Sequence, residues 1–186
     1  MTAVAAPDYV EPFVGWRVWS VAEVEGSFRL RSVVFDAVWP TREPMTAKCL
    51  RRRLRLPWRR SDLEHVPPVE ACSCGIYAST LQRLASYLDC EFERRRFHRV
   101  LGQVALWGSV VECQQGWRAS LAYPARLYVP THRTDGTGIE DAEELAFALA
   151  DYGVPVELLD CGRPGEVIDA VRLWLDEFLY GAVPTD

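Results

Sequence analysis

The first part of the chain shows the alternation of hydrophobic and polar residues that is typical of β-strands. Along Gly15–Val21 every second side chain falls on the same face of an extended segment. Glu25-Gly26 follows as a turn, and residues 28–35 form the second strand of a predicted hairpin. The fold is therefore expected to begin with an antiparallel pair of strands.

A second group of strands is predicted beyond residue 100. Residues 102–112 are rich in valine, and residues 117–122 continue the strand pattern after a turn at Gln114-Gln115-Gly116. Pro124 lacks the N–H group that a sheet ladder needs, so it is expected to end this strand. A short separate strand is predicted at residues 126–129.

Helical periodicity occurs in the middle and near the end of the chain. From Ile76 to about Asp89 apolar residues recur at steps of three and four, which predicts an amphipathic helix. A helix at 139–152, ended by Gly153, a strand at 154–159 and a helix at 164–180 follow. The predicted fold class is α+β: a small antiparallel β-rich domain with one helix, followed by a helix–strand–helix tail.

Charge is divided unevenly along the chain. Residues 131–186 contain 13 acidic residues and 3 arginines, a net charge of −10, whereas residues 1–130 carry 13 acidic and 18 basic residues, a net charge of +5. This asymmetry predicts two parts, a β-rich module at residues 1–130 and an acidic helical segment at residues 131–186. Apolar residues at 49% and charged residues at 25% are ordinary for a folded protein.

A long stretch with little regular pattern lies between residues 39 and 71, and such a loop must be tied to the domain. Three thiols and one imidazole occur in and beside it, a common tetrahedral ligand set for structural Zn²⁺. Gly75 allows a backbone turn there, and the helix predicted from Ile76 would favour nearby thiolates through its dipole. The candidate zinc ligands, with the spacing Cys-x15-His-x6-Cys-x-Cys, are Cys49, His65, Cys72 and Cys74.

Other interpretations of this pattern remain open. The cysteines could be ordinary buried residues and the histidine a surface residue. If Cys49 is not a ligand, the other three would resemble an open hydrolase or deaminase site, with Glu64 or Glu70 as general base. The His-x-Glu and Pro-Cys-x-x-Cys motifs of zinc deaminases are absent from the sequence. A closed structural site is therefore favoured.

Residues 48–60 form a basic segment with seven basic and no acidic residues. Arginines interleaved with a tryptophan could contact phosphates and stack on a base, which makes nucleic acid a candidate partner. A solvated face, or docking against the acidic tail, explains the same pattern, and the net charge of −5 argues against a dedicated nucleic-acid-binding protein. Binding of a small molecule or another anion by these arginines is equally compatible with the pattern. The candidate residues for nucleic-acid or anion binding are Arg51, Arg52, Arg53, Arg55, Trp58, Arg59 and Arg60.

The remaining cysteines and tryptophans are interpreted as core residues. Cys90, Cys113 and Cys161 lack partners in the sequence. The tryptophans of the predicted strands could form a cage for a cationic ligand, but burial in a small β-domain is their ordinary role. These tryptophans are Trp16, Trp19, Trp107 and Trp117.

Several classes of function are disfavoured. The sequence contains no GxSxG, GxxxxGK[ST] or GxGxxG motif, so no catalytic residues are predicted. No apolar run approaches the roughly 20 residues of a membrane span, and no basic segment precedes the apolar residues near the N-terminus. We therefore expect a cytoplasmic protein without a membrane partner.

Three stretches resemble a pattern in small uncharacterised actinobacterial and actinophage proteins. They are Gly-Trp-Arg-Val-Trp at 15–19, His-x6-Cys-x-Cys-Gly-Ile-Tyr-Ala at 65–78, and Leu-Trp-Gly, Gly-Trp-Arg-Ala and Ala-Tyr-Pro within 106–124. The resemblance implies that the His/Cys pattern and the tryptophan-bearing strands belong to one module of roughly 130 residues, with the acidic tail added. It implies no activity and no catalytic residues.

These observations predict a non-catalytic, zinc-stabilised binding or adaptor module for a protein or other macromolecular partner. Two alternatives remain open. One is a nucleic-acid-binding protein that uses the basic loop Arg51–Arg60, and the other is a zinc-dependent hydrolase or deaminase with an open metal site.

Overall fold

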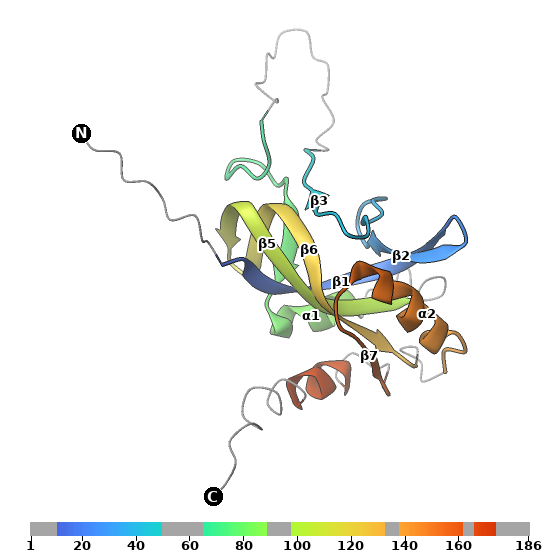
Figure 1. The fold of residues 1–186 in the computed structure, drawn as a ribbon. Coiled ribbons are helices and arrows are strands. Elements are labelled where there is room, and N and C mark those ends of the chain that lie inside the picture. Colours follow the sequence, from blue (N-terminus) through green and yellow to red (C-terminus); the bar gives the residue numbers. More distant parts are fainter. Residues whose placement is uncertain (1–10, 50–64, 89–97, 133–137, 162–165, 174–186) are drawn as a thin grey trace, which may run out of the picture.

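In the computed structural model the chain is one predominantly antiparallel sheet with helices on both sides (Figure 1). The predicted α+β class is confirmed. The helical elements are α1 (Leu81–Leu88), α2 (Ala142–Leu149), a 3₁₀ turn at Ala150–Tyr152 and a helical segment at 166–173. The strands are β1 (Phe13–Val24), β2 (Ser27–Ser32), β3 (Met45–Thr46), β4 (Ile76–Ser79), β5 (Arg99–Cys113), β6 (Gly116–Pro130) and β7 (Val156–Leu159). The structure describes residues 11–49, 65–88, 98–132, 138–161 and 166–173.

Four of the strands form a closed circuit of hydrogen bonding. β1 pairs with β5, β5 with β6, and β6 with β4, and β4 returns to β1 where Ser79 lies opposite Trp16. The turn into β6 fits closely against β4, because a Cβ atom at Gly116 would lie 2.1 Å from the carbonyl oxygen of Ala78. β2 extends the sheet from β1, while β3 and the parallel β7 pair with β6. Closure of this kind leaves few unpaired strand edges.

Both predicted hairpins are confirmed. β1 and β2 are joined at Glu25-Gly26, with Val24 opposite Ser27. β5 and β6 are joined at Gln114-Gln115, with Cys113 opposite Gly116. The first hairpin is shorter than predicted, since β2 ends at Ser32.

The prediction that Pro124 ends a strand is wrong. β6 runs from Gly116 through this proline to Pro130. The register with β5 shifts here, because Gln103 lies opposite Arg126 while Val104 lies opposite Pro124. The extra residue makes a β-bulge, and a bulge is one of the few places in a sheet where a residue without an N–H group is tolerated.

The helix predicted from Ile76 to about Asp89 is also wrong in its first residues. Residues 76–79 form β4, and the helix α1 begins only at Leu81. Ile76 and Ala78 are buried and lie opposite Ala119 and Trp117 of β6. Pairing with two neighbouring strands therefore overrides the helical periodicity of this segment.

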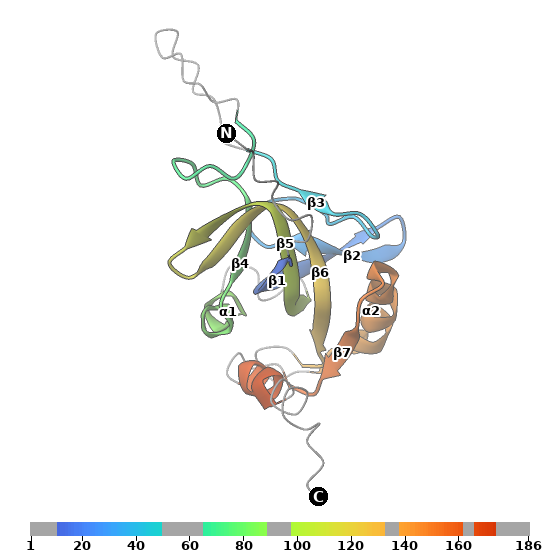
Figure 2. The ribbon, with the colours of Figure 1, turned by 60° about the vertical axis from the view of Figure 1, so that its left-hand side comes forward.

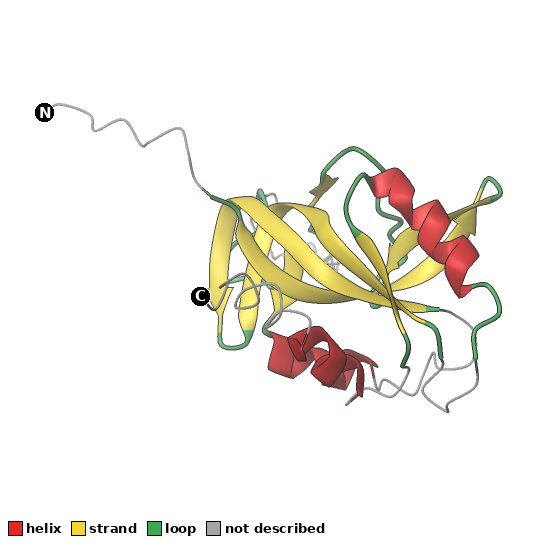
Figure 3. Ribbon diagram, turned by 60° about the horizontal axis from the view of Figure 1, so that its bottom comes forward, coloured by secondary structure: helices red, strands yellow, loops and turns green. Residues whose placement is uncertain are grey.

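The sheet carries a hydrophobic core on each face. Trp19 and Val21 point into the core beneath α2, whereas Trp16 and Val18 point into the core beneath α1 and the helical segment 166–173. The helices accordingly lie on opposite sides of the sheet (Figures 2 and 3). This is the alternation predicted for β1, and it confirms Trp16 and Trp19 as core residues. Trp107 and Trp117 are half-buried.

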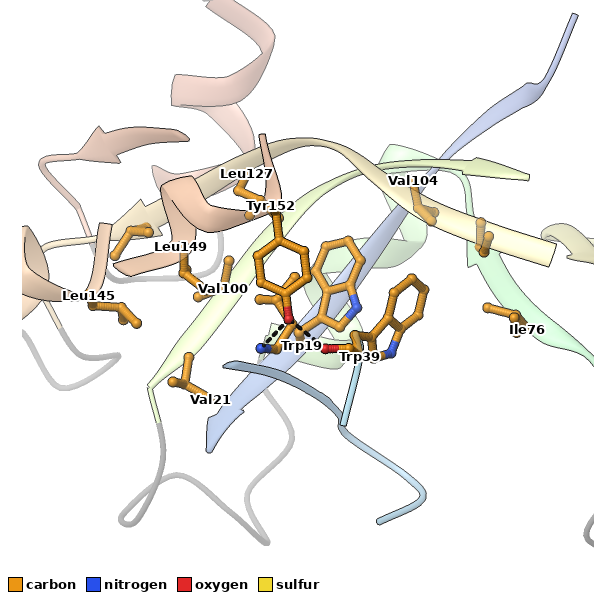
Figure 4. Packing of buried hydrophobic residues seen from close by; sticks show 14 of the residues in the cluster. Trp19, Val21, Trp39, Ile76, Val100, Val104, Leu127, Leu145, Leu149 and Tyr152 are labelled. Carbon is orange, nitrogen blue, oxygen red and sulfur yellow. Dashed lines mark hydrogen bonds between the residues drawn. The ribbon is translucent and has the colours of Figure 1, made fainter. Parts of the chain in front are cut away.

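A buried tyrosine joins the C-terminal part of the chain to the first hairpin. The hydroxyl of Tyr152 accepts a hydrogen bond from the Leu30 amide at 3.0 Å and donates one to the Trp39 carbonyl at 2.8 Å (Figure 4). Trp39 packs edge-to-face against Trp19, with ring centroids 5.4 Å apart. Gly153 ends the helical stretch as predicted. α2 therefore contributes to the core, and β7 contributes to the sheet. The division of the chain into a β-rich module and an acidic segment at residue 130 stays a prediction.

Candidate metal centre

Four side chains from separate places in the sequence converge beside the start of β4. Each offers one ligand atom, and all four atoms lie within 4.8 Å of one another. The Sγ atoms of Cys49 and Cys72 are 3.8 Å apart, and His65 Nε2 is 3.1 Å from Cys74 Sγ. Ligand atoms around a tetrahedral ion stand about 3.3 to 3.8 Å apart when metal–ligand bonds are near 2.0 to 2.3 Å. This Cys/His cluster can therefore hold one metal ion.

The short strand β3 delivers Cys49 to the Cys/His cluster. β3 pairs with residues 121–122 of β6, and the next residue, Ala47, donates its N–H to the Ser120 carbonyl at 2.8 Å. Cys49 follows two residues later and is half-buried. Hydrogen bonds to β6 therefore fix the backbone up to Ala47, two residues before the candidate ligand Cys49.

The opposite side of the Cys/His cluster comes from residues 65–75, which we call the metal loop. Arg118 of β6, only 6% exposed, donates hydrogen bonds to the carbonyl oxygens of Cys72 and Cys74, the latter at 2.9 Å. The hydroxyl of Tyr77 donates to the intervening Ser73 carbonyl at 2.7 Å. Three consecutive carbonyl groups are therefore held by side chains of the sheet. Outer-sphere contacts of this kind orient metal ligands.

Gly75 provides the sharp turn between the metal loop and β4. Its φ of +124° is a conformation that side-chain-bearing residues rarely adopt. A Cβ atom here would lie 3.1 Å from the Cβ of Arg118 and 3.2 Å from the Cβ of Pro68. The predicted need for a glycine after Cys74 is confirmed, and crowding adds a second reason for it.

His65 begins the described part of the metal loop. Its ring is half-buried with Nε2 directed at Cys74, while the neighbouring Val66 is 81% exposed. Pro67 and Pro68 come next and are both buried. Two buried prolines anchor the backbone between the histidine and the two later cysteines.

The two central thiols differ in acidity. A hydrogen bond from the Cys74 backbone lowers the pKa of Cys72 to about 7. Burial raises the pKa of Cys74 above its ordinary value. The thiolate is the form that binds metal, so the lowered pKa of Cys72 favours ligation near neutral pH. The raised pKa of Cys74 means that ionisation of its thiol depends more on the positive charge of a bound ion.

The expected helix N-terminus beside the cysteines is absent. Gly75 is followed by β4, and α1 begins five residues after Ile76. The expectation that a helix dipole stabilises the thiolates is therefore wrong. A backbone hydrogen bond to Cys72 and the guanidinium of Arg118 are the favourable groups next to these thiols.

Several candidate residues from the sequence are not part of the Cys/His cluster. Glu70 is exposed. Cys113 accepts a hydrogen bond from Arg118 Nε at 3.3 Å, and Cys161 is half-buried with its pKa raised by burial. The predicted nucleic-acid-binding residues lie outside the described part of the chain, as do Glu64 and Cys90: Arg51, Arg52, Arg53, Arg55, Trp58, Arg59 and Arg60.

Sequence reasoning missed Arg118 and Tyr77. Both are polar residues on strands, where alternation alone suggests side chains that face solvent. They lie opposite each other in the ladder of β4 and β6, and the Arg118 guanidinium is 5.8 Å from the centre of the Tyr77 ring. An arginine on a buried strand that pairs with the segment after two cysteines could have indicated this role. That pairing can be inferred only if residues 76–79 are first recognised as a strand.

Comparison with known proteins adds no assignment. No protein-family model, curated protein or solved structure matches the chain. In the part of the chain that the structure describes, no helix is both long and apolar enough to cross a bilayer. The interpretation of the site therefore rests on its geometry and chemistry.

Proposed function

We propose that the Cys/His cluster binds one structural Zn²⁺ and that this ion stabilises a non-catalytic binding module. The observation that carries the proposal is the convergence of four ligand atoms within 4.8 Å. Three sulfur atoms and one imidazole nitrogen suit Zn²⁺ better than Mg²⁺ or Ca²⁺, which prefer oxygen.

The ligand count supports a structural role for the ion. Four protein ligands complete a tetrahedron, whereas catalytic zinc sites usually keep one position for water. Cys49, which decides between the closed and open forms, has its Sγ 3.8 Å from that of Cys72. Of the two general bases suggested for an open site, Glu70 is exposed, and Glu64 lies outside the described residues. These observations favour the closed site over a hydrolase or deaminase.

The charges around the Cys/His cluster suit a permanently bound ion. Three thiolates and one neutral imidazole around Zn²⁺ carry a net charge of −1. Arg118 brings a compensating positive charge beside Cys72 and Cys74 and is itself buried. Buried charges are stabilised when they are paired in this way.

A binding role is supported by the surface next to the metal loop. Val34, Phe35 and Tyr77 are 76%, 54% and 43% exposed, and all three border one cavity. Exposed apolar side chains gathered around a hollow are typical of binding sites. The macromolecular partner expected from the sequence remains a proposal.

Metal content and stability test the proposal together. Protein purified without chelator should contain about one zinc per chain by elemental analysis. Cys72→Ser and Cys74→Ser should each lower the zinc content and the melting temperature, because metal-binding free energy is part of the folding free energy. Cys161→Ser, outside the Cys/His cluster, is the matched control and should leave the zinc content unchanged.

The proposal fails if the purified protein carries no metal and a chelator leaves its melting temperature unchanged. It also fails if Cys161→Ser lowers the zinc content as much as Cys74→Ser does. A site with a bound water and only three protein ligands would instead support the hydrolase or deaminase alternative.

A further inference from the structure

Cys49 and Cys72 lie 23 positions apart in the sequence, yet their Sγ atoms are 3.8 Å apart. The sulfur atoms of a disulfide are bonded at about 2.0 Å, so these two atoms need to approach by a little less than 2 Å. An approach of this size is within the reach of side-chain rotation. The pair is therefore a candidate for a disulfide bond as well as for metal ligation.

Hydrogen bonds to backbone groups hold both cysteines in place, and none of these bonds involves a ligand atom. On one side, β3 pairs with β6, and the Ala47 amide donates to a carbonyl of that strand two residues before Cys49. On the other side, Arg118 donates to the Cys72 carbonyl, and the Cys72 amide donates to the Val69 carbonyl at 2.9 Å. The two sulfur atoms are therefore held near each other by the sheet and the metal loop, without help from an ion.

Cys74 is a poorer disulfide partner for Cys72. Its sulfur atom is 3.1 Å from His65 Nε2, so an imidazole is its near neighbour. One nitrogen of Arg118 accepts no movement lightly at this point, because it donates to the carbonyl groups of both Cys72 and Cys74. A disulfide between two residues only two positions apart has to fit this restrained backbone, and poor disulfide geometry stores strain. Cys49 is the favoured partner.

An oxidant can reach the pair from the side of Cys49. Cys49 is half-buried, whereas Cys72 is 8% exposed. Val66 of the metal loop is 81% exposed, so the loop lies at the surface of the protein. Cysteine ligands of a metal ion are thiolates, and the thiolate is also the form of cysteine that peroxides oxidise.

We propose that Cys49 and Cys72 are a site of reversible oxidation, at which hydrogen peroxide produces a disulfide bond and the metal ion is released. The Cys49 thiolate attacks one peroxide oxygen and the O–O bond breaks, which gives a sulfenic acid and a hydroxide ion. The Cys72 thiolate then attacks the Cys49 sulfur, and the S–S bond forms as the S–O bond breaks and a second hydroxide leaves. Two protons from solvent convert the hydroxides to water. The sulfur atoms lose two electrons, and the peroxide gains them.

Oxidation removes two of the four candidate ligands. His65 and Cys74 alone do not complete a tetrahedron, so the ion is lost. The new bond joins the same two backbone segments that the ion joined, and the metal loop stays attached to β3. Ser73 and Gly75 of this loop line a cavity of about 660 Å³, so the wall of that cavity is kept in both states. The inference deepens the proposed function and rests on it only for the release of zinc.

Peptide mapping of the wild-type protein tests the pairing. Zinc-loaded protein is treated with a small excess of hydrogen peroxide, the remaining thiols are blocked with N-ethylmaleimide, and disulfides are identified by mass spectrometry. We expect Cys49–Cys72 as the main disulfide, with one zinc ion released to a chromophoric chelator for each bond formed. Dithiothreitol and added zinc should reverse both changes. A main disulfide that involves Cys74, or thiols that stay reduced or form only sulfinic acid, would overturn the proposal.

Two variants that each lose one candidate ligand provide a matched comparison. Cys74→Ser keeps the pair and should form the disulfide in a yield within about twofold of the wild type, although it binds less zinc. Cys72→Ser also loses a ligand but should form no Cys49 disulfide in comparable yield. Cys161→Ser, outside the Cys/His cluster, should behave as the wild type. Equal disulfide yields in Cys74→Ser and Cys72→Ser would contradict the proposal.

Thermal unfolding tests whether the disulfide keeps the metal loop attached. A bond between residues 49 and 72 restricts the unfolded chain, so the oxidised protein should melt at least about 5 °C higher than the reduced, zinc-free protein. An oxidised form that melts no higher would contradict this. Zinc measured before oxidation keeps the two proposals apart. Zinc without a later Cys49–Cys72 bond contradicts only this inference, and the bond in a protein that carries no zinc contradicts only the metal site.

Discussion

Arg118 donates a hydrogen bond to the carbonyl oxygen of Cys74 at 2.9 Å, although the two residues are 44 positions apart in the sequence. The same guanidinium nitrogen donates to the Cys72 carbonyl. One side chain of β6 therefore sets the spacing of two candidate ligands. The backbone of β6 also holds the residues that lead to Cys49, so this strand positions both sides of the Cys/His cluster.

Replacing this arginine should loosen the metal site without removing a ligand. Arg118→Met keeps an unbranched apolar chain and loses both hydrogen bonds to the metal loop, and we expect zinc affinity to fall about 10- to 100-fold. Competition with a chromophoric chelator measures this. Arg126→Met, on the same strand but paired with Glu157, is the control and should keep the wild-type affinity. An unchanged affinity in Arg118→Met would mean that the metal loop keeps its shape without this arginine.

Gly75→Ala and Gly153→Ala separate backbone strain from crowding at the metal loop. Both glycines have positive φ values, +124° and +68°, but only at Gly75 would a Cβ atom meet neighbouring atoms. Gly153→Ala should cost roughly 1 to 2 kcal/mol of stability and leave metal affinity unchanged. Gly75→Ala should cost at least about 1 to 3 kcal/mol and also weaken zinc binding. Urea unfolding and chelator competition give the two readouts, and equal zinc affinities would contradict the prediction.

The hydroxyl of Tyr152 should contribute measurably to stability. Tyr152→Phe leaves the Leu30 amide and the Trp39 carbonyl without their partner in the core, and we expect a loss of about 1 to 3 kcal/mol in urea unfolding. Phe147→Tyr adds the same hydroxyl at an exposed site of α2 and should change stability by less than about 0.5 kcal/mol. Similar effects of the two substitutions would show that the buried hydrogen bonds contribute little.

Stability should fall at alkaline pH. Burial raises the pKa of Tyr152 from 10.0 to about 12. Below pH 10 the phenol is neutral in both states. Between pH 10 and 12 the unfolded chain releases this proton and the folded chain retains it, so the free energy of unfolding should drop by about 1.4 kcal/mol per pH unit from this group. Tyr152→Phe should show a shallower decline over this range, and a parallel decline in both proteins would exclude Tyr152 as its cause.

Local patterns in the sequence were sufficient for the hairpins. Alternation along β1 and the turn at Glu25-Gly26 depend only on neighbouring residues, and so does the turn at Gln114-Gln115. The ligand types of the Cys/His cluster could also be predicted, because thiols and an imidazole in one loop share one coordination chemistry. The fold class followed from the order of these elements.

Predictions failed where a distant strand changed a local preference. Ile76 and Ala78 have helical periodicity with the residues after them, yet they pair with β6 because burial between strands is worth more than the local preference. Pro124 would end an isolated strand, but a bulge against Val104 removes the need for its missing N–H group. Neither outcome is visible without the partner strand.

The sequence by itself determined the hairpins, the α+β class and the chemical identity of the four candidate ligands, since each depends on residue type and short spacing. Only the tertiary structure decided that their ligand atoms meet within 4.8 Å, that Arg118 holds the loop carrying two of them, and that a cavity lies alongside. These features are created by pairing between strands far apart in the chain. No local pattern encodes which buried side chain a closed sheet will bring against a loop.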